Sequence, residues 1–385
     1  MPGFFTLPRV AWGTGAVEQV AGFGAQRVLL LADPDVAATD AVRRIEEEFT
    51  KGGASVTRWT VPGEPRRLST AESLLGRCRE AGPDWICAVG GGDLIDCAKA
   101  MRLRYELPDT PLDAVTPLTE FPANPRSRLV AFPSTSGRGR EVSGSISLER
   151  DDGSPLELYL REVAPEWAMV DPQLARGVPT ARGVETGLPI LGQSIESLVS
   201  AWANPFSDAL AFDALLQSAS HLPKLGRPMD DEVARERLHY AATQAGMAAA
   251  NAQLGIAHAF ALALREPTGL SYDRLYGIAL PGAVEFNWRS ARDRFEAISG
   301  VLASAAGEGG RLDLSLRLRS LLESLRIPAT LPDAGVDREA IWPRRKEIVS
   351  RVLRSPAALA NPRVPSEGEA ERLLDLLLGA GRVGR

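Results

Sequence analysis

Short runs of apolar residues alternate with amphipathic segments over the first half of the chain. The apolar runs predict β-strands at 27–32, 54–59, 85–89 and 129–132. The segments between them predict helices at 37–51, 69–81 and 93–102. Continuous apolar strands that alternate with helices are typical of a parallel sheet covered on both faces. We therefore expect an α/β domain over residues 1–179.

The pattern changes after Pro179, where alternating apolar positions almost disappear. Long segments rich in Ala, Leu, Glu and Arg predict helices at 208–222, 231–264, 312–325 and 367–378. The second domain, residues 180–385, is therefore expected to be all-helical. Ligands commonly bind in a cleft between two such domains, so we expect a ligand there.

Composition narrows the classes of function. The chain has 385 residues and a formal net charge of -5, with both signs interspersed, which argues against a nucleic-acid partner. Its three cysteines are too few for a disulfide framework and favour a reducing cytoplasm. Neither a signal peptide nor a membrane span is evident. We expect a cytoplasmic homo-oligomer, such as a homodimer, with no membrane partner.

A triple glycine, Gly90, Gly91 and Gly92, follows the third predicted strand directly. Glycines let a backbone approach a ligand closely, and the N-terminus of the following helix attracts a pyrophosphate. Asp96 and Lys99 lie three residues apart and so share a helical face. The alternative is an ordinary turn between strand and helix. We interpret the segment as a dinucleotide-binding loop.

A second polar loop follows the fourth strand. Ser134, Thr135 and Ser143 supply hydroxyl groups, and Gly137 allows close backbone approach. Arg138 and Arg140 are either solvated charges or, as we favour, binders of a substrate's anionic group, because a guanidinium matches a carboxylate or phosphate.

Two acidic residues qualify the interpretation. Asp93 follows the glycines, and a carboxylate beside a pyrophosphate is unfavourable unless it points away. Asp33 ends the first strand, where an acidic residue typically accepts hydrogen bonds from ribose hydroxyls. Its alternative role is to form a turn before Pro34.

Together these segments resemble the nucleotide-side signatures of the iron-containing alcohol dehydrogenase superfamily. The similarity extends along nearly the whole chain, through residues 168–172, 195–200, 203–209, 254–261, 325–328 and 361–363. The resemblance implies an NAD cofactor, held by Asp33, Gly90 to Asp93, Asp96, Lys99 and the second loop. It also implies that Asp33 favours NAD over NADP.

The metal site departs from this family. Where the resemblance implies an Asp and three His ligands, the chain has Pro189, Gln193, His258 and Tyr272. Catalytic zinc or iron needs about three protein ligands, so we expect no bound metal. His258 is then the best general base, because a histidine titrates near neutrality. Tyr272 and Gln193 would assist it, unless His258 is a vestige of the family's site.

Three functions remain open. The first is a metal-independent, NAD-dependent dehydrogenase that oxidises a secondary alcohol of an anionic substrate. A β-hydroxy acid would then lose CO2 after oxidation. One branch of the superfamily, the oxidative decarboxylases of daptide-type peptide biosynthesis, acts in this way on the C-terminal Thr of a ribosomal peptide, and the chain is similar to it. The alternatives are a lyase resembling the sugar-phosphate cyclases and a non-catalytic partner subunit.

Overall fold

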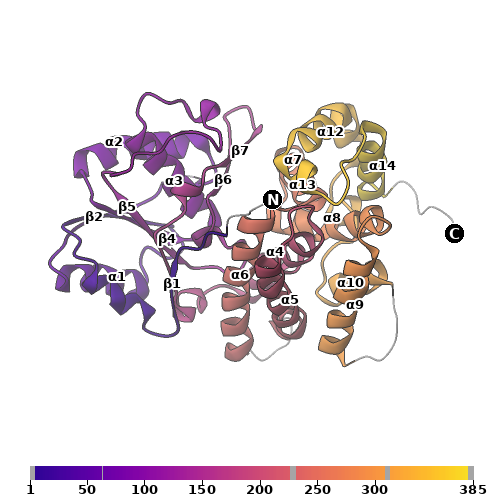
Figure 1. Cartoon of the computed structure of the whole chain (residues 1–385), viewed down its shortest axis with the longest axis horizontal. Helices are drawn as coiled ribbons and strands as arrows, with labels where there is room; N and C mark the ends of the chain where they lie inside the picture. Colours follow the sequence, from indigo (N-terminus) through magenta and orange to yellow (C-terminus); the bar gives the residue numbers. More distant parts are fainter. Residues whose placement is uncertain (1–4, 63, 226–230, 308–312, 380–385) are drawn as a thin grey trace. The chain divides into compact units, whose positions relative to one another are not determined.

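The computed structural model describes residues 5–62, 64–225, 231–307 and 313–379. The chain divides into two compact units, Met1–Val178 and Pro179–Arg385 (Figure 1). Each unit has its own secondary structure and its own hydrophobic core, and each is described here by itself.

The N-terminal unit contains a six-stranded parallel sheet in the order β1-β8-β5-β4-β2-β3. Its strands are β1 (Arg9–Trp12), β2 (Arg27–Ala32), β3 (Ser55–Thr60), β4 (Trp85–Gly90), β5 (Arg128–Pro133) and β8 (Trp167–Val170). The helices between them are α1 (Asp40–Lys51), α2 (Leu68–Ala81) and α3 (Gly92–Glu106). The predicted parallel α/β architecture is confirmed.

Both faces of the sheet are buried, as the continuous apolar strands predicted. In β2, Leu29 and Leu31 pack into one core with residues of α2 and α3. Val28 and Leu30 pack into the opposite core with residues of α1 and of the 3-10 helix η1 (Ala16–Gly22). Each strand therefore contributes apolar side chains to two layers, which explains why alternation is absent from its sequence.

Two parts of this unit were not predicted. β1 is a four-residue edge strand with exposed positions, so it carries no continuous apolar signal. β6 (Ser145–Glu149) and β7 (Pro155–Tyr159) form a separate antiparallel hairpin. The hairpin rests on α3 and places residues 134–143 between β5 and itself.

The second unit is helical, as predicted. Its helices are α4 (Thr180–Val199), α5 (Pro205–Leu225), α6 (Glu232–Ala252), α7 (Ile256–Thr268), α8 (Tyr272–Asn287), α9 (Arg292–Ala306), α10 (Leu314–Ser324), α11 (Arg338–Ile341), α12 (Arg345–Arg354), α13 (Pro356–Ala360) and α14 (Glu367–Leu377). Leu, Ile and Ala side chains from these helices fill one core. Residue 312 of the predicted helix 312–325 lies outside the described residues.

One prediction in this unit was wrong. Residues 231–264 are two helices, α6 and α7, and not one. The break includes Gln253, whose φ is 62°, and Gly255. A Cβ atom at Gly255 would lie 2.8 Å from Glu196 Oε1 and 2.9 Å from Asn361 Oδ1. The chain therefore bends where only a glycine permits the close approach of two polar side chains.

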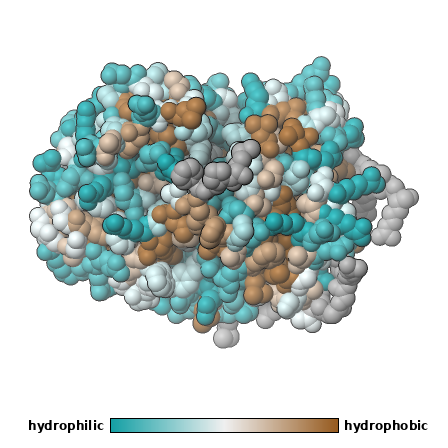
Figure 2. Space-filling model, in the orientation of Figure 1, coloured by the Kyte–Doolittle hydropathy of each residue, from teal (hydrophilic) through white to brown (hydrophobic). Residues whose placement is uncertain are grey.

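The surface is mixed. Figure 2 shows mostly hydrophilic and intermediate residues, interrupted by separate hydrophobic patches. Exposed large apolar residues of the described chain include Trp12, Trp202, Phe206 and Leu359. None of the described helices is by itself long and apolar enough to cross a membrane; α6 and α7 pass that test only when joined across a 104° bend.

Candidate functional site

The first group of predicted residues lies at the carboxyl ends of β4 and β5. Gly90 and Pro133 are paired across the two strands, so the loops that follow begin side by side. The Ser134 backbone N–H donates to Gly90 O at 2.9 Å. We call Gly90, Gly91, Gly92, Ser134 and Thr135 the glycine cradle.

Gly90 and Gly91 differ in what a side chain would meet at each position. A Cβ atom at Gly90 would lie 2.3 Å from Asp33 Oδ2 and 2.5 Å from Leu94 Cδ2, so any side chain there would displace Asp33 and Leu94. At Gly91 the nearest atom would be Thr135 Oγ1, at 3.6 Å, an ordinary contact. The fold would therefore tolerate a Cβ atom at Gly91. No side chain of the described residues caps α3 there, which suits a phosphate at the helix N-terminus.

Asp33 joins the end of β2 to this turn. Its Oδ2 atom accepts a hydrogen bond from the Gly91 N–H at 2.7 Å. Its own backbone N–H donates to Val89 O at 3.1 Å. Asp33 therefore shapes the cradle from the adjacent strand, beyond forming a local turn. Its predicted contact with a ribose stays a prediction.

Asp96 and Lys99 do share a helical face, and that face is buried. Lys99 Nζ donates to Asp96 Oδ1 at 3.1 Å and to Ser145 O at 2.9 Å. Asp96 Oδ2 accepts from the Ser147 N–H at 3.0 Å. Burial lowers the pKa of Lys99 to about 8, although Asp96 opposes the shift. The pair fastens the β6–β7 hairpin to α3, and its predicted role in cofactor binding is untested.

The two arginines of the second loop are not solvated charges. Their side chains are 11% and 9% exposed, respectively. Arg138 donates to Asp93 Oδ1 at 2.6 Å, and Arg140 Nε lies 3.3 Å from Asp96 Oδ2. The charge of Asp93 is therefore compensated by Arg138, which answers the objection to a carboxylate beside the glycines.

The second group of predicted residues lies in the helical unit. His258 Nδ1 is 2.7 Å from Tyr272 Oη, within hydrogen-bond distance. The two rings meet edge to face, with centroids 5.6 Å apart. Both residues are buried. The structure thus brings together two residues fourteen positions apart that the sequence predicted to cooperate.

Two further residues complete this cluster, and the sequence analysis missed their role. Tyr276 Oη donates to Glu196 Oε2 at 2.6 Å, and Glu196 accepts from the Ala257 and His258 N–H groups at 2.8 and 3.3 Å. Burial raises the pKa of Glu196 and that of Tyr276. Tyr272 and Tyr276 are four positions apart on α8, and that helical spacing was the available signal.

We call His258, Tyr272, Tyr276 and Glu196 the aromatic cluster. Its packing depends on α4, because a Cβ atom at Gly192 would lie 2.9 Å from the Tyr276 ring. Gln193 is the next residue of α4 and is 3% exposed. Pro189, one turn earlier, lies in the interior of the same helix. α4, α7 and α8 therefore carry the four residues, Pro189, Gln193, His258 and Tyr272, that the resemblance placed at the family's ligand positions.

The residues present do not fit a catalytic metal. Proline has no ligating side chain, and glutamine and tyrosine replace two of the expected ligands. Within the described residues no group of three or more His, Cys, Asp or Glu side chains could hold a metal ion. Gly91 and the uncapped α3 do fit a dinucleotide.

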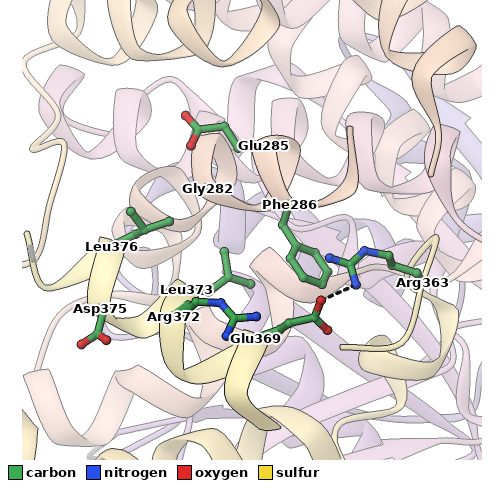
Figure 3. Close-up of a pocket in the computed structure, with 9 residues that line it drawn as sticks. All are labelled: Gly282, Glu285, Phe286, Arg363, Glu369, Arg372, Leu373, Asp375 and Leu376. Atoms are coloured by element: carbon green, nitrogen blue, oxygen red, sulfur yellow. Dashed lines mark hydrogen bonds and ion pairs between the residues drawn. The ribbon is translucent and has the colours of Figure 1, made fainter. Parts of the chain in front are cut away.

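A groove of about 390 Å³ also lies on the helical unit (Figure 3). Phe286, Leu373 and Leu376 supply apolar surface, and Arg363 pairs with Glu369 at 2.7 Å along its edge. The Arg363 guanidinium lies 3.8 Å from the centre of the Phe286 ring. No predicted site residue lines this groove.

Comparison with known proteins identifies the family. Residues 8–172 match the model "Iron-containing alcohol dehydrogenase", and residues 183–378 match the model "Fe-containing alcohol dehydrogenase family, C-terminal". An alcohol dehydrogenase of Thermococcus barophilus is 33% identical, over 96% of this chain and 98% of its own. An NADPH-dependent butanol dehydrogenase of Clostridium saccharobutylicum is 30% identical, over 96% and 97%.

A solved structure agrees with these matches. The iron-containing alcohol dehydrogenase of Thermococcus thioreducens superposes with a TM-score of 0.87 at 31% identity, covering 99% of this chain and all of its own. These matches favour the dehydrogenase hypothesis over the lyase. With an α/β unit that carries the glycine cradle and a helical unit behind it in sequence, the chain belongs to the iron-containing alcohol dehydrogenase family, whose members are oxidoreductases that act on CH–OH groups with NAD(P).

Proposed function

We propose that this chain is an NAD-dependent dehydrogenase that works without a metal ion. Its substrate is an anionic secondary alcohol of the β-hydroxy acid class, such as the C-terminal Thr of a ribosomal peptide. The observation that carries the proposal is the 2.7 Å contact between His258 Nδ1 and Tyr272 Oη at positions where the family has metal ligands. The glycine cradle and the membership of the family support an NAD cofactor, and NAD would accept the hydride.

Oxidation of an alcohol releases a hydride and a proton, and the His258–Tyr272 pair would accept that proton. With Nδ1 within hydrogen-bond distance of Tyr272 Oη, the His258 ring is oriented by the phenol, and the imidazole would accept the substrate's hydroxyl proton. If the phenol donates to Nδ1, Nε2 carries the proton and the pair can stabilise a developing alkoxide as a donor. Bound NAD would supply the hydride acceptor.

Oxidation of the hydroxyl group produces a ketone. In a β-hydroxy acid this ketone is β to the carboxylate, so the C–C bond to CO2 breaks readily and the electron pair passes to the carbonyl as an enolate. The loss of CO2 makes the sequence irreversible. A substrate of this class therefore suits a site whose proton acceptor provides only roughly 10²–10⁴-fold acceleration in place of a Lewis acid.

The direct test is to treat the purified protein with a chelator and follow reduced nicotinamide by absorbance, with NAD⁺ and candidate hydroxy acids or Thr-ended peptides. Wild-type protein should retain turnover, and elemental analysis should find no stoichiometric iron or zinc. His258→Ala should lower turnover by about 10²–10⁴-fold with NAD affinity intact. His221→Ala, on α5 of the same unit, is the matched control.

Two results would contradict the proposal. One is about one metal ion per chain bound near His258, together with loss of turnover on chelation. The other is full turnover in both His258→Ala and Tyr272→Phe, which would place the proton acceptor elsewhere.

A further inference from the structure

Arg138 and Arg140, the two buried arginines of the second loop, differ in the hydrogen bonds that their guanidinium groups make. Arg138 makes a 2.6 Å hydrogen bond to Asp93. Arg140 is 8% exposed, yet its contact with Asp96 lacks hydrogen-bond geometry and its Nε atom has no acceptor in the described chain. Asp96 is already used by Lys99 and by the Ser147 N–H. A guanidinium left in this state costs free energy unless an acceptor completes it.

Arg140 also lies against the start of α3. A Cβ atom at Gly92, the first residue of that helix, would be 3.1 Å from Arg140 Cγ. The arginine stem therefore lies at the helix N-terminus, where the dipole favours negative charge.

A second unsatisfied donor lies three residues further on. Ser143 directly follows the 3-10 turn Arg140–Val142 and is 5% exposed. Its Oγ atom is buried and has no hydrogen-bond partner among the described residues. Two buried polar atoms of one short loop, Arg140 Nε and Ser143 Oγ, thus lack a hydrogen-bond partner among the described residues, and buried polar atoms of native proteins rarely do so without a ligand or water.

We propose that Arg140 and Ser143 form an oxyanion subsite beside the N-terminus of α3, and that Arg138 is not part of it. The guanidinium fork presents parallel N–H groups to two oxygens of a phosphate or carboxylate, and the hydroxyl donates to one of them. Arg138 instead holds Asp93. The oxyanion is either the diphosphate of the dinucleotide or the carboxylate of the substrate, and only this identification rests on the proposed function.

Calorimetry separates the two sources. The variants are Arg140→Gln and Ser143→Ala, with Arg150→Gln as the control, because Arg150 pairs with Asp113 on the same unit outside the cradle. Each is titrated with NAD⁺ and with adenosine, which has no phosphate. NAD⁺-saturated protein is then titrated with 3-hydroxybutyrate and with its methyl ester, which has no carboxylate.

If the subsite binds the diphosphate, Arg140→Gln weakens NAD⁺ binding by about 10- to 100-fold and leaves adenosine unchanged. If it binds the substrate's carboxylate, NAD⁺ binding is unchanged and 3-hydroxybutyrate loses affinity by that factor, whereas the ester does not. Ser143→Ala should weaken binding of the same ligand by a smaller factor. If Arg140→Gln fails to fold, Ser143→Ala alone tells whether the subsite binds the diphosphate or the carboxylate.

The proposal is overturned if folded Arg140→Gln and Ser143→Ala both bind NAD⁺ and 3-hydroxybutyrate as the wild type does. Failure of the proposed function looks different: wild-type protein would bind NAD⁺ without any turnover, and the calorimetric comparison of the variants would still be decisive for the diphosphate arm.

Discussion

The glycine cradle and the aromatic cluster are built from different parts of the chain. The cradle consists largely of backbone, held by one carboxylate through the Asp33–Gly91 bond. The aromatic cluster consists of side chains, with His258 and Tyr272 joined at 2.7 Å. A backbone site tolerates few substitutions, because any Cβ atom changes the space available. A side-chain site can be rebuilt by exchanging residues on an unchanged helical frame.

The charged and titratable groups of the two regions are paired differently. Beside the cradle, the Asp93 carboxylate is paired with the Arg138 guanidinium, so the two charges compensate each other. In the helical unit, the positions that the resemblance assigns to metal ligands hold Pro189, Gln193 and Tyr272 with one histidine, His258. The first region therefore pairs a carboxylate with a guanidinium, whereas the second pairs an imidazole with a phenol.

The largest effect should come from filling the space in front of the cradle. Gly91→Val should weaken NAD⁺ binding by about 100-fold, or ~3 kcal/mol, because its side chain would occupy the space left for a pyrophosphate. Its thermal midpoint should change little, since the Cβ atom makes only ordinary contacts. Gly90→Ala is the matched variant and should lower stability as well, because it collides with Asp33 and Leu94. Unchanged NAD⁺ affinity in Gly91→Val would remove the cradle assignment.

Acid should affect the helical unit more than the N-terminal unit, since all three histidines lie beyond residue 179. Burial lowers the pKa of His239 to about 4. The unfolded chain therefore binds this proton more tightly, so the contribution is fully present above the unfolded pKa of about 6.5 and is lost as pH falls toward 4. The loss is at most about 3 kcal/mol.

Urea unfolding followed at pH 7 and pH 4.5 measures this loss. His239→Gln, which cannot take up the proton, should show a smaller difference between the two pH values than the wild type. Equal differences in the two proteins would show that His239 does not contribute to acid sensitivity.

The preference for NAD over NADP tests the role of Asp33 beside the cradle, and one relative is named as NADPH-dependent. NAD should be preferred, with repulsion of a 2′-phosphate by Asp33 worth roughly 1–3 kcal/mol. Asp33→Asn removes the charge but can still accept the Gly91 N–H. It should therefore reduce the preference without destroying the cradle, as measured by the ratio of the two dissociation constants. If wild-type protein binds both cofactors equally, Asp33 only supports the turn.

The smallest effect should come from removing one hydroxyl of the aromatic cluster. Tyr272→Phe deletes the partner of His258 Nδ1 and should lower turnover by about tenfold, the scale of one hydrogen bond. Tyr276→Phe is the comparison, because its hydroxyl bonds Glu196 and not His258. An equal loss of turnover in both variants would mean that the cluster acts through its packing alone.

Several features follow from local sequence. Apolar runs such as 85–89 were recognisable as buried strands because both faces of a parallel sheet exclude water. The glycines at the end of β4 indicated a turn where the backbone can approach other groups closely. The three-residue spacing of Asp96 and Lys99 sufficed to predict that they share a helical face, where Lys99 Nζ donates to Asp96 Oδ1. The interpretation that Pro189, Gln193 and Tyr272 stand at ligand positions rests on residue identity alone and stays a prediction.

Other features were decided only by the tertiary structure. The break between α6 and α7 depends on Glu196 and Asn361, which approach Gly255 from distant segments. The pairing of Arg138 with Asp93 but of Arg140 with an already occupied Asp96 depends on how a loop crosses α3. Helical periodicity and residue type report what a segment buries, but not which partner it meets. Partner choice is set by contacts between segments far apart in the chain, and these exist only once the chain is folded.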